Sequence, residues 1–205
     1  MNKSLHRGER EGFSFVSELG LFVADDFTLP PMLYRQSRLV LRERGARTLT
    51  PAEFWRYYDF CMKERPNILQ QAKERGQFEY LDAVTYTSWE REGGGLCLIV
   101  HPEILSVKSE YKGGTVYRSV NPEGGEIPIC ERDDETSKQI GRFRREDVNP
   151  DTGLPRALGG EGEFAYIGNP YLTPSPVVIS WGIEADLTIC LSVTDSPFLV
   201  RECYE

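Results

Sequence analysis

Two glutamates separated by a single glycine stand in the stretch ALGGEGEFAYIGNPY, residues 157–171. Glu161 and Glu163 follow two glycines and precede a run with the composition of a strand. A carboxylate held beneath a developing positive charge stabilises a transition state more than the ground state. The pair therefore has two interpretations: the edge of a strand in a glycine-rich turn, or the carboxylates of a catalytic site.

A catalytic site would need partners elsewhere in the chain, and two stretches offer them. In RLVLRERG, Arg38 and Arg42 lie among apolar residues, and in VTYTSWE, Thr87 and Ser88 end a strand-like run. A guanidinium binds a phosphate through two parallel hydrogen bonds. In chain order the sequence thus offers an arginine, a Thr/Ser cluster and a Glu-x-Glu pair.

This order resembles the arginine, Ser-Thr-Ser, Glu-x-Glu pattern of the mono-ADP-ribosyltransferases, with TYTS here in the place of Ser-Thr-Ser. The resemblance implies NAD as the cofactor. Its pyrophosphate would be bound by Arg42, with Arg38 as the alternative for the same role. Thr87 and Ser88 would orient the nicotinamide half.

The same resemblance assigns roles to the two carboxylates. Glu163 would stabilise the oxocarbenium-like centre as nicotinamide leaves, and Glu161 would position the acceptor nucleophile. With Ser88, these are the catalytic residues that the resemblance implies. An NAD-dependent transferase is therefore one hypothesis for the function, and its geometric requirement is that Arg42, Ser88 and Glu163 line one pocket.

The run EDVNPDTGLP offers a second hypothesis, a calcium site. Asp147, Asn149 and Asp151 alternate, so three side-chain oxygens could face one centre, and Ca²⁺ takes 6–8 oxygen ligands. Glu161 or Glu163 could complete the shell. The sixth position is not the glycine of a calcium loop, and Asn-Pro-Asp-x-Gly is also a turn sequence. We therefore expect a turn and predict no metal ligands, with a calcium-binding domain as an alternative.

Arginines are concentrated between residues 35 and 47. They are Arg35, Arg38, Arg42, Arg44 and Arg47, offset only by Glu43. If residues 32–44 form a helix, Arg35, Arg38 and Arg42 share one face. The cluster is either a solvated helix face or the best place on the chain for a phosphate or an acidic partner.

The chain has two histidines and five cysteines. His6 lies in the polar N-terminal stretch, and His101 ends the run CLIVH. Along a strand, four residues separate Cys97 from His101 by about 13 Å, so the two cannot form a dyad directly. Cys61 or Cys190 could still approach His101 in the fold. We expect His101 to be a strand-end residue with a satisfied hydrogen bond.

Charge and cysteine usage narrow the class of protein. The chain has 205 residues and a net charge of −8, from 32 acidic and 24 basic side chains. A field of this sign disfavours general binding to nucleic acid or to a membrane surface. The chain has no CxxC or Cys/His ladder and no long apolar run, which predicts a soluble, cytoplasmic protein with reduced cysteines and no structural zinc.

The clearest helix is predicted after Thr50, in LTPAEFWRYYDFCMKERP. Thr50 is a natural N-cap, Pro51 suits the first turn, and Glu53 completes a capping box. A second helical piece is expected from Pro66 to Gly76. Residues 28–45 are ambiguous between helix and strand, and we lean towards helix.

The rest of the chain has the character of strands. Residues 78–86 alternate, and 95–101 form a short apolar run typical of a buried strand. Further candidates are TVYRSV, EIPIC, EFAYIG, PVVISW, DLTICLSV and PFLVREC. We predict an α+β fold, with one or two helices in the N-terminal third packed on a mostly antiparallel sheet or half-barrel.

We expect a flexible arm over residues 1–12 and one domain over 13–205. A charged insertion at about 131–147 is expected to form a solvated loop or a short helix. We predict an interaction or regulatory module that binds another protein, because this function does not require distant stretches of the chain to form one site. The NAD-dependent transferase and the calcium-binding domain are the alternatives.

Overall fold

The computed structural model describes residues 11–76, 78–88, 95–101, 103–108, 115–120, 126–129, 140–168, 175–182, 187–191 and 197–205. Within these ranges, three α-helices pack on strands that form a large sheet and two small ones, which confirms the predicted α+β class. Residues 1–10 of the expected arm and 131–139 of the expected insertion lie outside the described residues.

The predicted capping box begins helix α2 (Pro51–Glu64). The Thr50 hydroxyl accepts the Glu53 backbone N–H, while the Glu53 carboxylate accepts the Thr50 backbone N–H. Arg65 then breaks the helical geometry before Pro66, as expected of a residue that precedes proline. Helix α3 (Pro66–Arg75) follows and ends at Gly76, whose φ of 55° is left-handed.

Helix α1 (Tyr34–Glu43) resolves the ambiguity of residues 28–45. The two prolines before it, Pro30 and Pro31, belong instead to a short strand, β3 (Leu29–Met32). Both prolines are exposed, and proline is tolerated where a strand lies at the edge of a sheet. The predicted helix is thus confirmed, preceded by an edge strand.

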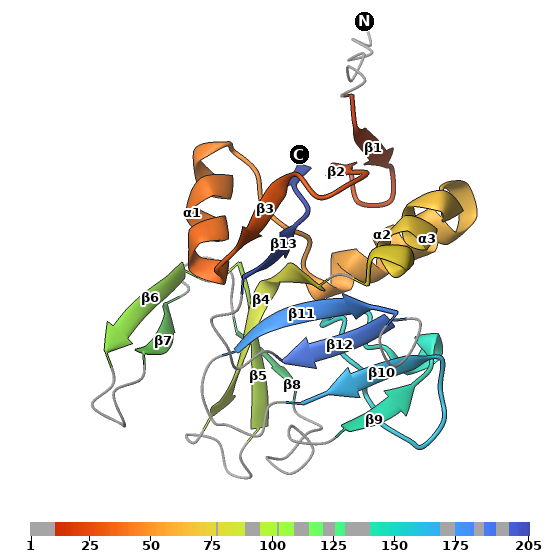
Figure 1. Cartoon of the computed structure of the whole chain (residues 1–205). Helices are drawn as coiled ribbons and strands as arrows, with labels where there is room; N and C mark the ends of the chain where they lie inside the picture. The colour runs from red at the N-terminus through yellow and green to blue at the C-terminus, as the bar shows by residue number, and fades with distance from the viewer. Residues whose placement is uncertain are drawn as a thin grey trace, which may run out of the picture.

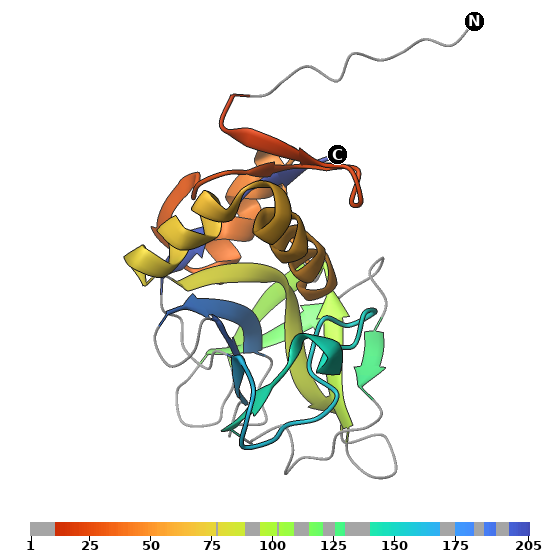
Figure 2. The ribbon, with the colours of Figure 1, turned by 90° about the vertical axis from the view of Figure 1, so that its right-hand side faces the viewer.

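The large sheet has nine strands and is mostly antiparallel. Two neighbouring pairs are parallel, β10 with β12 and β13 with β4. Strands β5 and β8 extend the sheet from the later part of β4, which is long and strongly bent (Figure 2). The strands in order are β3, β13 (Phe198–Val200), β4 (Phe78–Ser88), β11 (Ser175–Trp181), β12 (Leu187–Leu191), β10 (Phe164–Ile167) and β9 (Ile140–Phe143), with β5 (Gly95–Val100) and β8 (Glu126–Ile129) attached.

Segments from both ends of the described chain lie side by side (Figure 1). Strand β13 lies between β3 and β4 in the large sheet. The smaller three-stranded sheet consists of β1 (Phe13–Val16), β2 (Leu21–Ala24) and β14 (Cys203–Tyr204). A separate hairpin joins β6 (Glu103–Lys108) to β7 (Thr115–Val120).

The second half of the expected charged insertion is ordered differently from a solvated loop. Residues 140–143 form strand β9, and Arg145–Asp147 form a 3₁₀ turn, η1. The reason is Phe143, whose side chain is buried in the core while β9 pairs with β10. One buried aromatic residue therefore ties this charged segment to the sheet.

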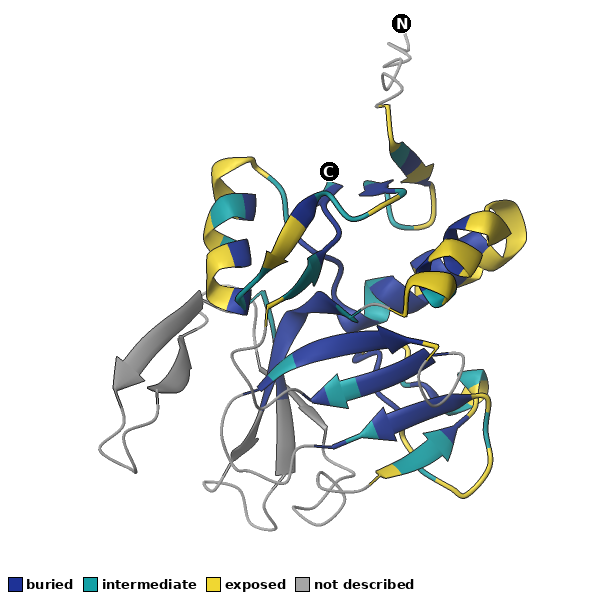
Figure 3. Cartoon of the chain, in the orientation of Figure 1, coloured by how far each residue is buried: buried dark blue, intermediate teal, exposed yellow. Residues whose placement is uncertain are grey.

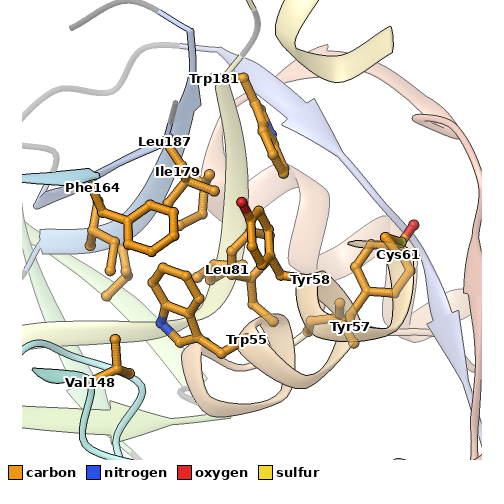
Figure 4. Packing of buried hydrophobic residues seen from close by; sticks show 14 of the residues in the cluster. Trp55, Tyr57, Tyr58, Cys61, Leu81, Val148, Phe164, Ile179, Trp181 and Leu187 are labelled. Atoms are coloured by element: carbon orange, nitrogen blue, oxygen red, sulfur yellow. The ribbon is translucent and has the colours of Figure 1, made fainter. Parts of the chain in front are cut away.

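Most of the described residues in β4, β10, β11 and β12 are buried (Figure 3), and helices pack on both faces of the sheet. Helices α2 and α3 cover one face, where Trp55, Tyr58, Phe164 and Trp181 contact one another edge-on or stacked (Figure 4). Helix α1 covers part of the other face, over Tyr80, Val84 and Val178. We call these the α2 face and the α1 face. Among the described residues, no helix combines the length and apolar character needed to cross a bilayer.

The burial of the cysteines makes a prediction about their reactivity. Burial raises the pKa of Cys61 to about 11 and that of Cys203 to about 12, so neither forms appreciable thiolate at neutral pH. Cys190 is only half-buried. We expect Cys190 to react with a thiol reagent faster than Cys61 and Cys203, as measured by peptide mapping after short exposures. In urea the three cysteines should react at equal rates. Equal rates for the three cysteines in the native protein as well would contradict this burial.

Candidate functional site

An acidic side chain lies among the apolar residues of the α1 face. Strand β4 points Phe78, Tyr80 and Val84 towards this face, because alternate residues of a strand share a side. Asp82 falls in the same alternation, and its side chain is fully buried. A buried carboxylate is costly unless charged or hydrogen-bonding partners surround it, so its neighbours define a site.

Two side chains bind the Asp82 carboxylate, one at each oxygen. Arg38, from α1, donates from Nη1 to Oδ1 in an ion pair. His101, the residue after β5, places Nδ1 2.7 Å from Oδ2. The backbone N–H of His101 also donates to the carbonyl oxygen of Asp82, at 3.2 Å. One carboxylate thus connects α1, β4 and the end of β5. We call Arg38, Asp82 and His101 the Asp82 centre.

The hydrogen bond predicted for His101 is confirmed, and its partner identifies an arrangement that the sequence did not reveal. Its backbone φ is 55°, the left-handed region that side chains other than glycine seldom adopt. His101 is the one such residue outside glycine in the described part of the chain. Cys61 lies in the cluster on the α2 face and is not part of this arrangement.

Tyr34 packs beside the Asp82 centre at the beginning of α1. Its ring lies 5.0 Å from that of Tyr80, and its buried hydroxyl has no hydrogen-bond partner among the residues that the structure describes. Burial and the charge of Asp82 hold the pKa of Tyr34 well above its usual range, so the phenol stays protonated. The carboxylate of Asp82 therefore lies in a largely aromatic setting, where its charge acts strongly on its neighbours.

The arginine cluster predicted from the sequence is divided by the fold. Arg38 is directed inward to Asp82. Arg44 pairs with Glu202 at 2.6 Å, and Arg47 pairs with Glu53 through two hydrogen bonds of 2.6 and 2.7 Å. Burial would lower the pKa of Arg47, but Glu53 outweighs it and the pKa is raised. On α1, Arg38 lies three residues after Arg35 and four before Arg42, at the spacing expected of one helix face, but its guanidinium pairs with the buried Asp82.

The outer surface of α1 retains Arg35 and Arg42, which are both exposed. Leu39 lies between them, four residues after Arg35 and three before Arg42, which places all three on one side of the helix. Its relative exposure is 56%, among the highest of the large apolar residues in the described chain. We call Arg35, Leu39 and Arg42 the α1 outer surface.

A second buried charge pair lies on the α2 side of β4. Arg201 and Glu79 are both almost fully buried, with the guanidinium 3.2 Å from the carboxylate. Arg201 also donates to the backbone oxygens of Ala24 and Asp25, and its guanidinium lies over the Phe27 ring. Every side of this guanidinium is occupied by protein, so we assign the pair a structural role.

The predicted glutamate pair lies at a turn. Glu161 and Glu163 are both exposed, and Glu163 immediately precedes β10. Strand β10 pairs with β12, β12 with β11, and β11 with β4. Followed from strand to strand, these pairs place Phe164, the first residue of β10, level with the first residue of β4. Ser88 is the last residue of β4, with Thr87 before it, so both lie at the opposite end of that strand. The structure does not bring Glu163 and Ser88 together.

The remaining residues of the transferase hypothesis are placed separately. Arg42 lies on the α1 outer surface, and Arg38 belongs to the Asp82 centre. The side chains of Thr87 and Ser88 lie outside the described part of the structure. The single pocket that this hypothesis requires thus includes side chains that lie outside the described residues.

The loop proposed for calcium uses its oxygens in local hydrogen bonds. Asn149 accepts the Asp151 backbone N–H at 3.0 Å, and Asp147 accepts the Arg144 backbone N–H at 2.9 Å. The loop is also fixed to α2, since Trp55 donates from Nε1 to the Gly153 carbonyl at 2.8 Å. In the described ranges, no three His, Cys, Asp or Glu side chains gather as a metal site would require.

Sequence reasoning missed Asp82, although one signal was present. In FEYLDAVTY the apolar phase of the strand runs through Phe78 and Tyr80 to Val84, and Asp82 interrupts it. An acid in the buried phase of a strand indicates a partner elsewhere, but the pattern does not identify that partner. No family model, curated protein or solved structure matches the chain.

Proposed function

We propose that the chain is an interaction module that binds an acidic, apolar-bearing segment of another protein on the α1 outer surface. The observation that carries the proposal is the exposed Leu39 between Arg35 and Arg42. Arginine is enriched in protein-binding surfaces, where polar side chains surround an apolar centre.

Charge supports an acidic partner. The chain carries a net charge of −8, so a surface that presents two arginines is opposite in sign to the molecule as a whole. Such a surface steers acidic segments towards it and disfavours basic ones. The ion pair of Arg38 with Asp82 supports this role, because it fixes α1 to the sheet and holds the surface in one orientation.

The proposed setting is the cytoplasm. Cys61 and Cys203 are buried thiols that form no disulfide among the described residues, as in proteins of a reducing compartment. The expected partner is therefore an acidic protein of the same compartment.

Site-specific photo-crosslinking tests the proposal. A benzoylphenylalanine in place of Leu39 is expected to crosslink one partner protein in cytoplasmic extract. The matched control position is Met62 on α2, whose relative exposure is also 56%. The double substitution Arg35→Glu and Arg42→Glu should reduce the Leu39 crosslink at least about tenfold, because it reverses the charge of the surface.

A second control separates this surface from the general effect of charge. Arg56 and Arg65 are exposed on and beside α2. Reversing both should leave the Leu39 crosslink unchanged. Crosslinks of equal yield from positions 39 and 62, or a crosslink that survives Arg35→Glu and Arg42→Glu, would sink the proposal. Arg38 is left unchanged in every variant because it pairs with the buried Asp82.

A further inference from the structure

The small sheet of β1, β2 and β14 has one face in the core and one face towards solvent. Val16 of β1, Leu21 and Val23 of β2, and Cys203 of β14 are buried in the same apolar cluster as the α2 face. Successive residues of a strand point to opposite sides of a sheet. The residues between these buried ones therefore lie on the outer face.

The outer face carries four aromatic side chains. Phe15 pairs with Phe22 across β1 and β2, and Phe22 pairs with Tyr204 across β2 and β14, so three aromatic residues form one row across the sheet. The rings of Phe15 and Phe22 lie 5.0 Å apart. The ring of Phe13 lies 5.6 Å from that of Tyr204. We call Phe13, Phe15, Phe22 and Tyr204 the aromatic face.

The aromatic face is partly open to solvent. The relative exposure of Phe15 is 37%, and the other three residues are intermediate between buried and exposed. Single exposed apolar side chains are ordinary on a protein surface, but adjacent ones form a patch, and such patches are typical of binding sites. Aromatic side chains are also enriched in protein interfaces. The composition of this face therefore indicates a binding surface.

The charges that accompany the aromatic face are acidic. Residues 11–25 and 202–205, which form the three strands and their connections, contain no basic side chain, and their charged residues are Glu11, Glu18, Asp25, Glu202 and Glu205. Glu11, Glu18 and Glu205 are exposed, and each lies within three residues of an aromatic-face residue along the chain. The exposed charge on this sheet is thus negative.

The arginines next to β14 do not reverse this sign. Three arginines lie within or contact residues 201–203, and each is paired with a carboxylate: Arg44 with Glu202, Arg47 with Glu53, and Arg201 with Glu79. These ion pairs balance the three positive charges. The exposed glutamates therefore decide which partner the sheet attracts.

We propose that the aromatic face binds an arginine-bearing, apolar segment of another protein. A guanidinium stacks on aromatic rings and pairs with carboxylates, and this face offers both groups. The chain itself contains such stacking, since the Arg201 guanidinium lies 4.7 Å from the centre of the Phe27 ring.

Charge separates this partner from other occupants. Acidic side chains around the rings disfavour nucleic acid and anionic membranes. A second copy of the chain is disfavoured because each copy carries a net charge of −8. The proposal is independent of the α1 outer surface, which presents arginines and so attracts segments of the opposite charge.

Fluorescence anisotropy with labelled peptides tests the proposal on the full chain. The probe is a peptide in which arginine alternates with leucine, and the matched control peptide has glutamate in place of arginine. The arginine peptide should bind saturably and about tenfold more tightly than the glutamate peptide. A labelled oligouridine should not bind. Equal affinity for the two peptides, or tighter binding of oligouridine, would overturn the proposal.

A substitution on β1 locates the binding. Phe15→Thr removes the most exposed ring but keeps a β-branched residue suited to a strand, and it should weaken binding of the arginine peptide about tenfold. The matched control is Ile140→Thr on β9, where the removed side chain has a relative exposure of 74%. This control should bind like the wild type. If folded Phe15→Thr also does so, the aromatic face is not the binding surface.

A charge variant decides the matter even if Phe15→Thr does not fold, because it changes only exposed side chains. Glu11→Lys with Glu18→Lys should weaken binding of the arginine peptide about tenfold. Glu146→Lys with Glu161→Lys makes the same change in net charge beside β9 and β10 and should have little effect. Equal losses in the two variants would reduce the binding to general charge attraction and contradict a specific site.

Sedimentation velocity distinguishes a second copy from a partner protein. The wild-type chain should remain a monomer at the concentrations used for the peptide titrations. Self-association that Glu11→Lys with Glu18→Lys or Phe15→Thr abolishes would make another copy of the chain the occupant of the aromatic face, and it would overturn the proposal.

Discussion

Glu79→Ala is expected to lower the free energy of unfolding by about 3–5 kcal/mol, because it leaves Arg201 buried without its carboxylate. The guanidinium would keep its hydrogen bonds to Ala24 and Asp25, but these neutral oxygens do not compensate a full charge. Urea unfolding, followed by the fluorescence of the buried Trp55 and Trp181, measures the change.

Two controls separate the charge from the contact. Asp59 pairs with Arg145 at 2.6 Å on the surface, and Asp59→Ala should cost less than about 1 kcal/mol. The double change Glu79→Leu with Arg201→Met removes both charges, and it should recover much of the loss. If Glu79→Ala costs no more than Asp59→Ala, the pair is not the buried, mutually dependent unit described above.

Gly153→Ala is expected to destabilise the protein by about 3 kcal/mol or more. Gly153 has a φ of 70°, and an added Cβ would overlap the backbone of Pro51 and Ala52 at the start of α2. Left-handed strain contributes about 1–2 kcal/mol, and the overlap adds the cost of moving backbone. Thermal or urea unfolding of the variant measures the sum.

Two other glycines divide this effect into its parts. Gly45 has a φ of 64° with open space around it, so Gly45→Ala should show the left-handed strain alone. Gly160 has neither a positive φ nor a close neighbour, and Gly160→Ala should be near neutral. We expect costs in the order Gly153, Gly45, Gly160. A Gly153→Ala cost equal to that of Gly45→Ala would mean that the loop withdraws from α2 freely.

Local patterns predicted the elements well where the determinants lie within a few residues. The capping box of Thr50 and Glu53 and the left-handed stop at Gly76 are local, and both are confirmed. In the charged segment, residues 140–143 form a strand in place of the expected loop because Phe143 is buried in the core, whereas Arg145–Asp147 form a short 3₁₀ helix. A single buried aromatic side chain stabilises a strand more than several exposed charges oppose it.

The candidate site was beyond prediction for a physical reason. Arg38 and Asp82 are 44 positions apart, and nothing in the pattern around Arg38 distinguishes it from Arg35 or Arg42. Its inward direction is decided by the packing of α1 on β4. Conversely, the spacing of Glu161 and Glu163 resembles that of a catalytic pair, yet both are exposed at a turn. The sequence shows which side chains could take part in chemistry, but it does not show which of them the fold brings together.

The central position of β13 has a consequence for the time that folding takes. Arg201 contacts Ala24, 177 positions earlier, and β13 must enter between β3 and β4 before either pairing is complete. Closing so large a loop loses chain entropy before the contacts repay it, and proteins with such distant contacts refold in milliseconds to seconds rather than microseconds. Until that closure, the β4 side of the sheet remains an open edge on which a second, half-folded copy could pair.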